Sequence, residues 1–380
     1  MKIAILTSTR ADFTLLKNLI CKLKITKKLD TKVICTGSHF SKKHGFTFNE
    51  IKKSQIQVDK KIILSNKNSS INLIKDGNLL STTIAKYFIE NKTELLIVLG
   101  DRFEILYSVL AAYLCRVKIA HIHGGEVTHG SLDDSIRHAI TKLSDYHLVA
   151  HKNYKKRIIQ LGEKKENIFI VGGLGAEAIT KTTLVNKISL SKILKIDFKK
   201  KIALVCVQPE TNNIKNTKKI IIETLSAISE FKDITFVFTA PGVDLGSLEI
   251  ISKIKKFIKK NKNCLFINSL GGKLYYSMMS QVDFIIGNSS SGILEMPSFK
   301  KPTINIGKRQ SGRIFSKSVL SVGMNRNLIK NAIKKALQSK NIKHINPYKK
   351  PKTSEKIVSI IKNIKINNEN HKKFFDIKFN

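Results

Sequence analysis

The stretch LLIVLGDRFEILYSVL, residues 95–110, decides the fold. Its first five residues are all apolar, which is typical of a short strand that is buried on both faces of a parallel sheet. Gly100-Asp101 then interrupts the run, and a helical pattern of apolar residues follows from Ile105. A buried strand, a polar turn and a helix form the repeating unit of doubly wound α/β domains. The stretch therefore predicts a parallel sheet covered by helices.

The same alternation runs along the chain in two series, and 380 residues are too many for one ordinary core. Residues 179–201 are rich in Lys, Thr and Ser and look like a linker between the series. We therefore expect two doubly wound domains, residues 1–180 and 181–380, with the last helix able to pack back on the N-terminal domain and the ligand in an interdomain cleft. The expected strands are 2–6, 32–35, 95–99, 118–122, 146–150 and 168–171 in the first series, and 202–207, 234–239, 264–267, 284–286 and 303–306 in the second.

The composition excludes several classes of protein. The formal net charge is +40, but the lysines are spread over the polar faces of the expected helices, and no nucleic-acid motif gathers them. We therefore expect neither nucleic acid nor membrane as a partner, also because no apolar run is long enough to span a bilayer and no signal peptide is recognisable. The five cysteines are scattered and odd in number, which favours a reducing cytoplasm.

Polar residues follow the expected strands at the edge where such folds bind ligands. Thr9, Arg10 and Asp12 come after the first strand, and either Arg10 binds an anion or Thr9 and Asp12 simply cap the next helix. Asp101 and Arg102 come after the strand 95–99, where Asp101 could equally cap a helix and pair with Arg102.

The segment HIHGGEVTHGSLDDSIRH, residues 121–138, carries the densest group of reactive side chains. His121 and His123 alternate on one face of the expected strand, but a third metal ligand is not apparent, so we expect no metal. Gly124-Gly125 would let the backbone approach a ligand. Helix capping needs a single acid, whereas the segment offers Glu126, Asp133 and Asp134. Carboxylates that converge with Asp101 in one cleft could divide acid and base roles.

The second half offers an expected anion site. GNSSSG, residues 287–292, follows a strand and precedes a helix, where backbone amides and the helix dipole favour anions. Glu295 would lie one turn further on, within reach of a ribose diol, and GKRQSGR, residues 307–313, adds cations for a diphosphate. The alternative is a serine-rich turn that only caps a helix.

Together these loops resemble those of the hydrolysing UDP-N-acetylglucosamine 2-epimerases of sialic acid synthesis, over nearly the whole chain. The resemblance implies two Rossmann-like domains in the glycosyltransferase-B architecture. The motifs that carry it are TSTRAD (7–12), TGSHF (36–40), VLGDRFEI (98–105), HIHGGE (121–126), LDDSIRHAITKLS (132–144), RIIQLGE (157–163), PET (209–211), GNSSSGILEMPS (287–298) and INIGKRQSGR (304–313).

The resemblance also implies a reaction that needs neither metal nor nicotinamide cofactor. UDP-N-acetylglucosamine loses UDP by elimination across C1–C2, and water adds to the resulting glycal to release N-acetylmannosamine. By position, the implied acid/base residues are Asp101, Glu126 and Asp133. The implied contacts to the UDP-sugar are Arg10, His39, Arg102, Gln208, Ser289, Ser290, Glu295 and Arg309. A homodimer or homotetramer is also implied.

Two positions depart from the family pattern. His123 stands where some relatives carry a catalytic Glu, so either His123 or Glu126 must fill that role. Gln208 stands where the family usually has a His, and it cannot titrate, although its amide can donate a hydrogen bond to a phosphate oxygen.

Three alternatives stay open. The first is the same reaction on UDP-2,4-diacetamido-2,4,6-trideoxyglucose, which would supply legionaminic acid. The second is a glycosyltransferase of the same architecture. The third is a basic protein without catalytic activity that binds polyanions.

Overall fold

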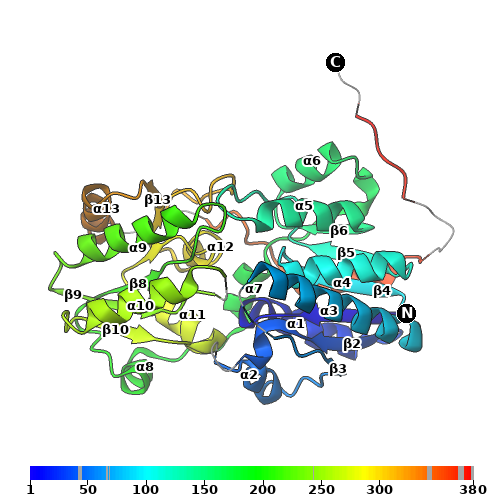
Figure 1. Cartoon of the computed structure of the whole chain (residues 1–380), viewed down its shortest axis with the longest axis horizontal. Coiled ribbons are helices and arrows are strands. Elements are labelled where there is room, and N and C mark those ends of the chain that lie inside the picture. Colours follow the sequence, from blue (N-terminus) through cyan, green and yellow to red (C-terminus); the bar gives the residue numbers. More distant parts are fainter. Residues whose placement is uncertain are drawn as a thin grey trace. The chain divides into compact units, whose positions relative to one another are not determined.

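The computed structural model describes residues 1–41, 45–65, 67, 69–242, 244–339, 345–366 and 372–377. The chain forms two compact units, and Figure 1 shows helices around a central sheet in each. Unit 1 comprises residues 1–126, 133–178 and 350–380, and unit 2 comprises residues 127–132 and 179–349. The chain thus enters unit 2 for six residues in the middle of the 121–138 segment.

Unit 1 contains a parallel sheet of seven strands in the order β3-β2-β1-β4-β5-β6-β7 among the described residues. This is the Rossmann order with one additional strand at the end. The strands are β1 (Lys2–Thr7), β2 (Asp30–Cys35), β3 (Lys60–Lys61), β4 (Leu95–Leu99), β5 (Lys118–Ile122), β6 (Tyr146–Val149) and β7 (Ile168–Ile170).

Two apolar layers cover the sheet of unit 1. One face packs against α1 (Arg10–Ile25) and the C-terminal helix α14 (Thr353–Asn363). The other face packs against α3 (Ser70–Asn91), α4 (Phe103–Leu114) and α5 (Asp133–Leu143). All five residues of β4 are buried, as expected for a central strand with helices on both faces. The remaining helices of the unit are α2 (Phe48–Lys53), α6 (Lys152–Gln160) and α7 (Leu174–Lys181).

Unit 2 contains a parallel sheet in the order β10-β9-β8-β11-β12-β13, the Rossmann order itself. Helices α9 (Ile214–Ile228), α10 (Ser247–Ile258) and α13 (Arg326–Gln338) cover one face of this sheet. The other helices are α8 (Lys187–Leu194), α11 (Gly271–Gln281) and α12 (Ser291–Leu294). The strands are β8 (Lys201–Cys206), β9 (Ile234–Thr239), β10 (Cys264–Ile267), β11 (Phe284–Gly287), β12 (Thr303–Ile306) and β13 (Val319–Val322).

The structure confirms the predicted α/β class and every expected strand. The interpretation of residues 179–201 as a linker is wrong, because the stretch contains α8 and the end of α7. Asn186 caps α8 by accepting a hydrogen bond from the backbone amide of Ser189, and Leu190 anchors the helix in the core. The strands β3 and β13 were not expected. Within the described ranges, no helix is both long enough and apolar enough to cross a membrane.

Candidate active site

The TSTRAD segment joins β1 to α1 through a helix cap. The Thr9 hydroxyl accepts a hydrogen bond from the Asp12 amide at 3.2 Å, and the Asp12 carboxylate accepts from the amides of Ser8 and Thr9 at 3.0 Å. This reciprocal pair is a capping box. The capping alternative therefore explains Thr9 and Asp12. It leaves Arg10, half-buried in the first turn of α1, as the candidate ligand-binding residue of the segment.

His39 lies in a short 3-10 turn, residues Gly37–Phe40, and is fully buried. Its Nε2 is 3.0 Å from the Thr7 hydroxyl and its Nδ1 is 2.9 Å from the Thr47 hydroxyl. Burial lowers the pKa of His39, so the ring is neutral at neutral pH. Both ring nitrogens of His39 therefore lie within hydrogen-bond distance of hydroxyl groups of the protein, and its contact with the substrate stays a prediction.

A buried arginine connects the ends of β4 and β5 to α5. Arg137 is 1% exposed, and its Nη1 donates to the Glu126 carbonyl at 2.9 Å and to Asp134 Oδ1 at 3.0 Å. Its Nη2 forms an ion pair with Asp101, which follows β4. A buried guanidinium is stable only when it is paired and hydrogen-bonded. Arg137 therefore fixes Asp101 and the Glu126 backbone relative to the start of α5, where Asp133 is the first residue.

Arg137 was not among the predicted site residues. The sequence signal was present, because Arg137 lies three residues before buried Ile140 and four before buried Thr141, on the inward face of α5. An arginine on that face indicates buried acidic partners. Along α5, Arg137 forms an ion pair with Asp134, three residues before it.

Glu126 and His123 form a second contact in unit 1. His123 Nδ1 lies 3.1 Å from Glu126 Oε1, and Glu126 is 1% exposed. The amide of Leu174 donates to His123 Nε2 at 3.4 Å, which places the proton of a neutral ring on Nδ1, toward the carboxylate. His123 has a left-handed φ of 66°, rare for a residue other than glycine and more frequent at functional sites.

The expectation that His121 and His123 share one strand face is not met, because β5 ends at Ile122 and His123 turns out of the strand. Only His121 follows the strand pattern. Its Nε2 is 2.8 Å from the Gly100 carbonyl oxygen and its Nδ1 is 3.1 Å from the Thr141 hydroxyl. His121 is therefore a structural residue that ties β5 to the end of β4 and to α5.

The two glycines after His123 are needed for packing within the protein. A Cβ on Gly124 would lie 2.9 Å from His121 Nδ1 and from the Thr141 hydroxyl. A Cβ on Gly125 would lie 2.6 Å from the Tyr154 carbonyl oxygen, and Gly125 has a φ of 74°. The predicted role of Gly124-Gly125 in admitting a ligand is therefore replaced by close contact with α6 and with neighbouring side chains.

His121 makes the protein's stability sensitive to acid. Burial, the largest cause, lowers the pKa of His121 to about 3, whereas the unfolded ring titrates near 6.5. Between these values the unfolded chain binds more protons, so the free energy of unfolding should fall as pH falls through this window. We expect His121→Gln to flatten this dependence, measured as the change in urea midpoint between pH 7 and 5. His129→Gln, at an exposed residue, should keep the wild-type slope, and an unchanged slope in His121→Gln would contradict the assignment.

Residues 127–132 belong to unit 2. The His129 amide donates to the Ser311 carbonyl at 3.2 Å, and the Leu132 amide donates to the Thr211 hydroxyl at 3.0 Å. A Cβ on Gly130 would lie 2.6 Å from Arg309 Cα, so only glycine permits this approach. The middle of the segment 121–138 therefore packs against the PET and GKRQSGR loops. Its two ends carry Glu126 and Asp133 in unit 1.

In unit 2, Gln208 and buried Asn288 join the loops after β8 and β11. The Gln208 amide N–H donates to Asn288 Oδ1 at 2.6 Å, and Asn288 Nδ2 donates to the Gln208 carbonyl at 2.9 Å. The side chain of Gln208 accepts a hydrogen bond from the Gly242 amide through Oε1 at 2.8 Å. This contact directs the acceptor atom of Gln208 to the protein and makes Nε2 the atom that can donate to a ligand.

Arg309 follows β12 and links the same two loops. Its Nε donates to the Pro209 carbonyl at 3.2 Å and its Nη1 to the Asn288 carbonyl at 3.4 Å. A guanidinium has five N–H donors, so these contacts orient Arg309 and leave it able to bind an anion.

The helix expected after GNSSSG is a single turn. Ser289 and Ser290 immediately precede α12, which has only four residues, and Glu295 ends it as a buried residue. A turn of this length has a weak macrodipole, so the predicted dipole contribution to anion binding is smaller than expected. The Ser289 hydroxyl lies 3.1 Å from that of Ser291, which in turn lies 2.6 Å from the Tyr275 hydroxyl. The loop is therefore ordered by its own hydroxyl groups.

Sequence reasoning also missed Glu104, a buried acid near the end of β4. Arg102 Nε lies 3.1 Å from Glu104 Oε2, so Arg102 is oriented by an ion pair inside unit 1. Burial raises the pKa of Glu104, and Arg102 opposes that shift. The sequence feature that could have indicated Glu104 is that it is the single charged residue of the helix 103–114. Asp101 thus pairs with Arg137, and Arg102 pairs with Glu104.

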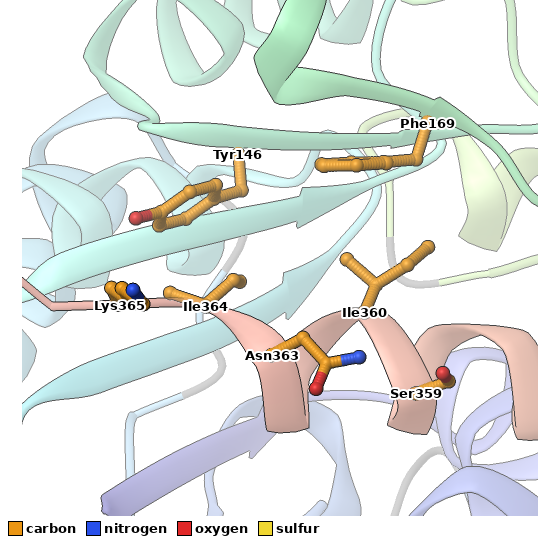
Figure 2. Close-up of a pocket in the computed structure, with 7 residues that line it drawn as sticks. All are labelled: Tyr146, Phe169, Ser359, Ile360, Asn363, Ile364 and Lys365. Carbon is orange, nitrogen blue, oxygen red and sulfur yellow. The ribbon is translucent and has the colours of Figure 1, made fainter.

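A separate cavity of about 440 Å³ lies in unit 1 between α14 and the strands β6 and β7. Figure 2 shows the rings of Tyr146 and Phe169 on one side and Ile360 and Ile364 on the other. The predicted site residues do not line this cavity. Among the described residues, no group of three His, Cys, Asp or Glu side chains is placed to hold a metal ion.

The family model for UDP-N-acetylglucosamine 2-epimerases matches residues 22–362. The chain belongs to the UDP-N-acetylglucosamine 2-epimerase family. Relatives of this epimerase-family chain include the GDP/UDP-N,N'-diacetylbacillosamine 2-epimerase (hydrolyzing) of Campylobacter jejuni, 37% identical over 85% of each chain. They also include the polysialic acid biosynthesis protein P7 of Escherichia coli, 36% identical over 99% of this chain and 97% of the relative.

The fold of this family member is also seen in solved structures. The crystal structure of the Neisseria meningitidis UDP-GlcNAc 2-epimerase bound to UDP-GlcNAc matches with a TM-score of 0.80. The match covers 96% of this chain and 100% of that chain, at 18% sequence identity. The α/β architecture is therefore that of the family, the glycosyltransferase-B type of fold.

Proposed function

We propose that this protein is a hydrolysing 2-epimerase that converts UDP-N-acetylglucosamine to UDP and N-acetylmannosamine. Membership of the family supports epimerisation of a UDP-sugar. The observation that carries the proposal is the group formed by Arg137, Asp101 and the Glu126 backbone, with the Glu126–His123 pair beside it. This arrangement concentrates acid/base groups at the ends of two neighbouring strands.

The reaction needs one group to remove the C2 proton and another to return a proton at C2 after the diphosphate has left. In the first step a base takes the C2 proton, the C–H electrons form the C1–C2 double bond, and UDP leaves with the C1–O electrons. In the second step water adds to C1 and a proton adds to C2 on the opposite face. We assign these transfers to Asp101, Glu126 and Asp133. His123 lies with Nδ1 3.1 Å from Glu126 Oε1, where the ring can assist the proton exchange of this carboxylate.

Cations and hydrogen-bond donors must hold the leaving diphosphate. We assign this role to Arg10, Arg102, Gln208 and Arg309. Gln208 is suited to it because Oε1 is bonded to Gly242 and Nε2 is the donor. Ser289, Ser290 and Glu295 complete the proposed nucleotide-binding set.

A second substrate is also supported. The Campylobacter jejuni relative is named for a diacetamido sugar and is 37% identical. We therefore propose the corresponding UDP-2,4-diacetamido-2,4,6-trideoxyglucose as the alternative substrate for the same reaction. The two sugars differ at C4, where an acetamido group replaces the hydroxyl, and at C6, where a methyl group replaces the hydroxymethyl group.

Nuclear magnetic resonance in deuterated water tests both substrates. UDP-N-acetylglucosamine should give free UDP and N-acetylmannosamine that carries deuterium at C2. Turnover of the diacetamido sugar alone would assign the enzyme to the alternative. No turnover of either sugar by folded protein would reject the proposed reaction.

Gln208 provides a test of the nucleotide site. Gln208→Ala should weaken UDP binding by roughly 10- to 150-fold, because a hydrogen bond to a charged group contributes about 1.5–3 kcal/mol. Gln208→His should retain or raise turnover, because a histidine ring can also donate to phosphate. Isothermal titration with UDP and steady-state rates measure the two effects. Wild-type UDP affinity in Gln208→Ala would remove Gln208 from the site.

A cytoplasmic location and a homodimer or homotetramer belong to the same proposal. All five cysteines are free thiols, which favours a reducing compartment. The only proposed partners are the UDP-sugar and further copies of the chain, without nucleic acid or membrane.

A further inference from the structure

The C-terminal segment, residues 372–377, lies against the turn that follows α6 in unit 1 (red in Figure 1). The Phe375 amide donates to the Gly162 carbonyl at 2.9 Å. Phe374 packs so closely on this turn that a Cβ on Gly162 would collide with its ring. The Lys142 ammonium lies 4.3 Å from the centroid of the same ring, which is a cation–π contact. The segment is therefore held by a backbone hydrogen bond, by packing and by charge.

Lys372 connects the C-terminal ends of two helices. Its ammonium donates to the carbonyl of Lys142, in the last turn of α5, and to that of Ser144 at 2.6 Å. The same nitrogen lies 2.7 Å from Oε2 of Glu163, in the turn after α6. Carbonyls at a helix C-terminus lack partners within the helix and favour a nearby cation. Lys372 therefore joins the end of α5 to the turn after α6 through one charged group.

Glu163 makes this connection sensitive to the loss of Lys372. The Glu163 side chain is 3% exposed, and its carboxylate also lies 3.0 Å from the ammonium of Lys142 and 3.1 Å from Nε2 of buried His147. A buried carboxylate is stable only where cations and hydrogen-bond donors compensate for its lost hydration. Of the two ammonium groups, that of Lys372 is the nearer. Its removal would leave Glu163 less well compensated and would release the two carbonyls at the end of α5.

The same two helices hold the backbone beside Glu126. Arg137 of α5 donates to the Glu126 carbonyl at 2.9 Å. Arg157 of α6 donates to the carbonyl of the preceding residue, Gly125. Each arginine lies less than two turns of helix from the helix end that is tied to Lys372. A helix is rigid over so short a length, so movement at the joined ends would reach both arginines and the backbone that they hold.

We propose that Lys372 is a positioning residue for the candidate active site: by joining the ends of α5 and α6, it keeps Glu126 where proton transfer requires it. The inference rests on the proposed function, which makes Glu126 an acid/base residue. Lys372 acts through the two helices, and the proposed nucleotide contacts are other residues. Its loss should therefore lower kcat and leave the affinity for UDP unchanged. A displacement of about 1 Å at a catalytic group can cost a factor of about 100 in rate.

Steady-state kinetics with three variants, on the UDP-sugar that wild type turns over, test the positioning role. Lys372→Met removes the charge and keeps a side chain of similar length. It should lower kcat roughly tenfold, while UDP affinity, measured by isothermal titration, stays within about twofold of wild type. Lys372→Arg keeps the charge and the donors, so its kcat should stay within about twofold of wild type. Lys373→Met is the matched control at the next residue, which is exposed, and it should match wild type. Unchanged kcat in Lys372→Met would overturn the positioning role, as would an equal loss in Lys373→Met.

Hydrogen–deuterium exchange of the unligated protein supplies a readout that does not depend on activity. Lys372→Met should speed the exchange of amides in α5 and α6 by roughly tenfold, because local opening is easier once the helix ends are released. Lys373→Met should keep the wild-type rates. Wild-type exchange in both helices of Lys372→Met would overturn the proposal. If folded wild type turned over neither UDP-sugar, the proposed function would fail, whereas the exchange rates would still decide whether Lys372 joins the two helices.

Discussion

Asp101→Asn is expected to lower turnover of the UDP-sugar by about three orders of magnitude, because a general base contributes 10²–10⁴ to the rate. The asparagine side chain has almost the same shape, and its carbonyl oxygen can accept the hydrogen bond from Arg137 that the aspartate accepts now. The fold should therefore persist while the negative charge and the proton-accepting ability are lost. Initial rates of UDP release, measured with a coupled assay, give the effect.

The binding of UDP separates a chemical role of Asp101 from a structural one. UDP affinity should stay within about twofold of wild type, since the proposed nucleotide contacts are other residues. Asp145→Asn is the matched control, because Asp145 pairs with Lys118 at the opposite end of β5 and should tolerate the same change of charge. Glu126→Gln should cause a loss similar to that of Asp101→Asn. Near-normal rates in both variants would remove these carboxylates from the chemistry.

The sequence predicted the fold well because buried parallel strands leave a strong signal. Five consecutive apolar residues such as Leu95–Leu99 match a central strand buried by helices on both faces. The missed strand β3 has two residues, Lys60 and Lys61, and its pairing comes from neighbouring β2 rather than from its own apolar content. The sequence did not predict α8 because its own apolar pattern is also weak. Its stabilising features are an Asn cap and one buried leucine.

The site was predictable in residue type but not in pairing. Hydrogen-bond partners that are distant in sequence cannot be read from local spacing, so the pairing of Asp101 with Arg137, 36 residues away, was not predicted. The same limit applies to His39, whose two ring nitrogens lie within hydrogen-bond distance of the Thr7 and Thr47 hydroxyls.

Glycine patterns in a sequence are ambiguous for a physical reason. The space that a missing Cβ leaves at Gly124 or Gly125 can be filled by a ligand or, as here, by the protein itself.

Arg137→Met is expected to destabilise the protein by about 3–5 kcal/mol, because it removes the partner of two carboxylates and of the Glu126 carbonyl from a buried position. Arg137→Lys should cost less, since the charge is retained, but a lysine ammonium cannot reproduce the planar geometry that reaches three acceptors. Urea unfolding measures both values. Turnover of Arg137→Lys should fall about a hundredfold, because Asp101 and Glu126 lose their common support, while UDP affinity stays near wild type.

The matched control is Lys118→Met, which breaks a partly exposed ion pair with Asp145 in the same sheet. Exposed pairs contribute little, so this variant should lose less than about 1 kcal/mol and keep its turnover. Comparing Lys118→Met with Arg137→Met separates the effect of losing a positive charge from the effect of losing buried ion pairs and hydrogen bonds.

If Arg137→Lys were as active as wild type, the guanidinium would be needed for folding alone. The carboxylates would then have to be oriented by α5 and the loop after β5 without it. If Arg137→Lys lost turnover and UDP affinity together, Arg137 would support the nucleotide site as well, and its action could not be confined to the carboxylates.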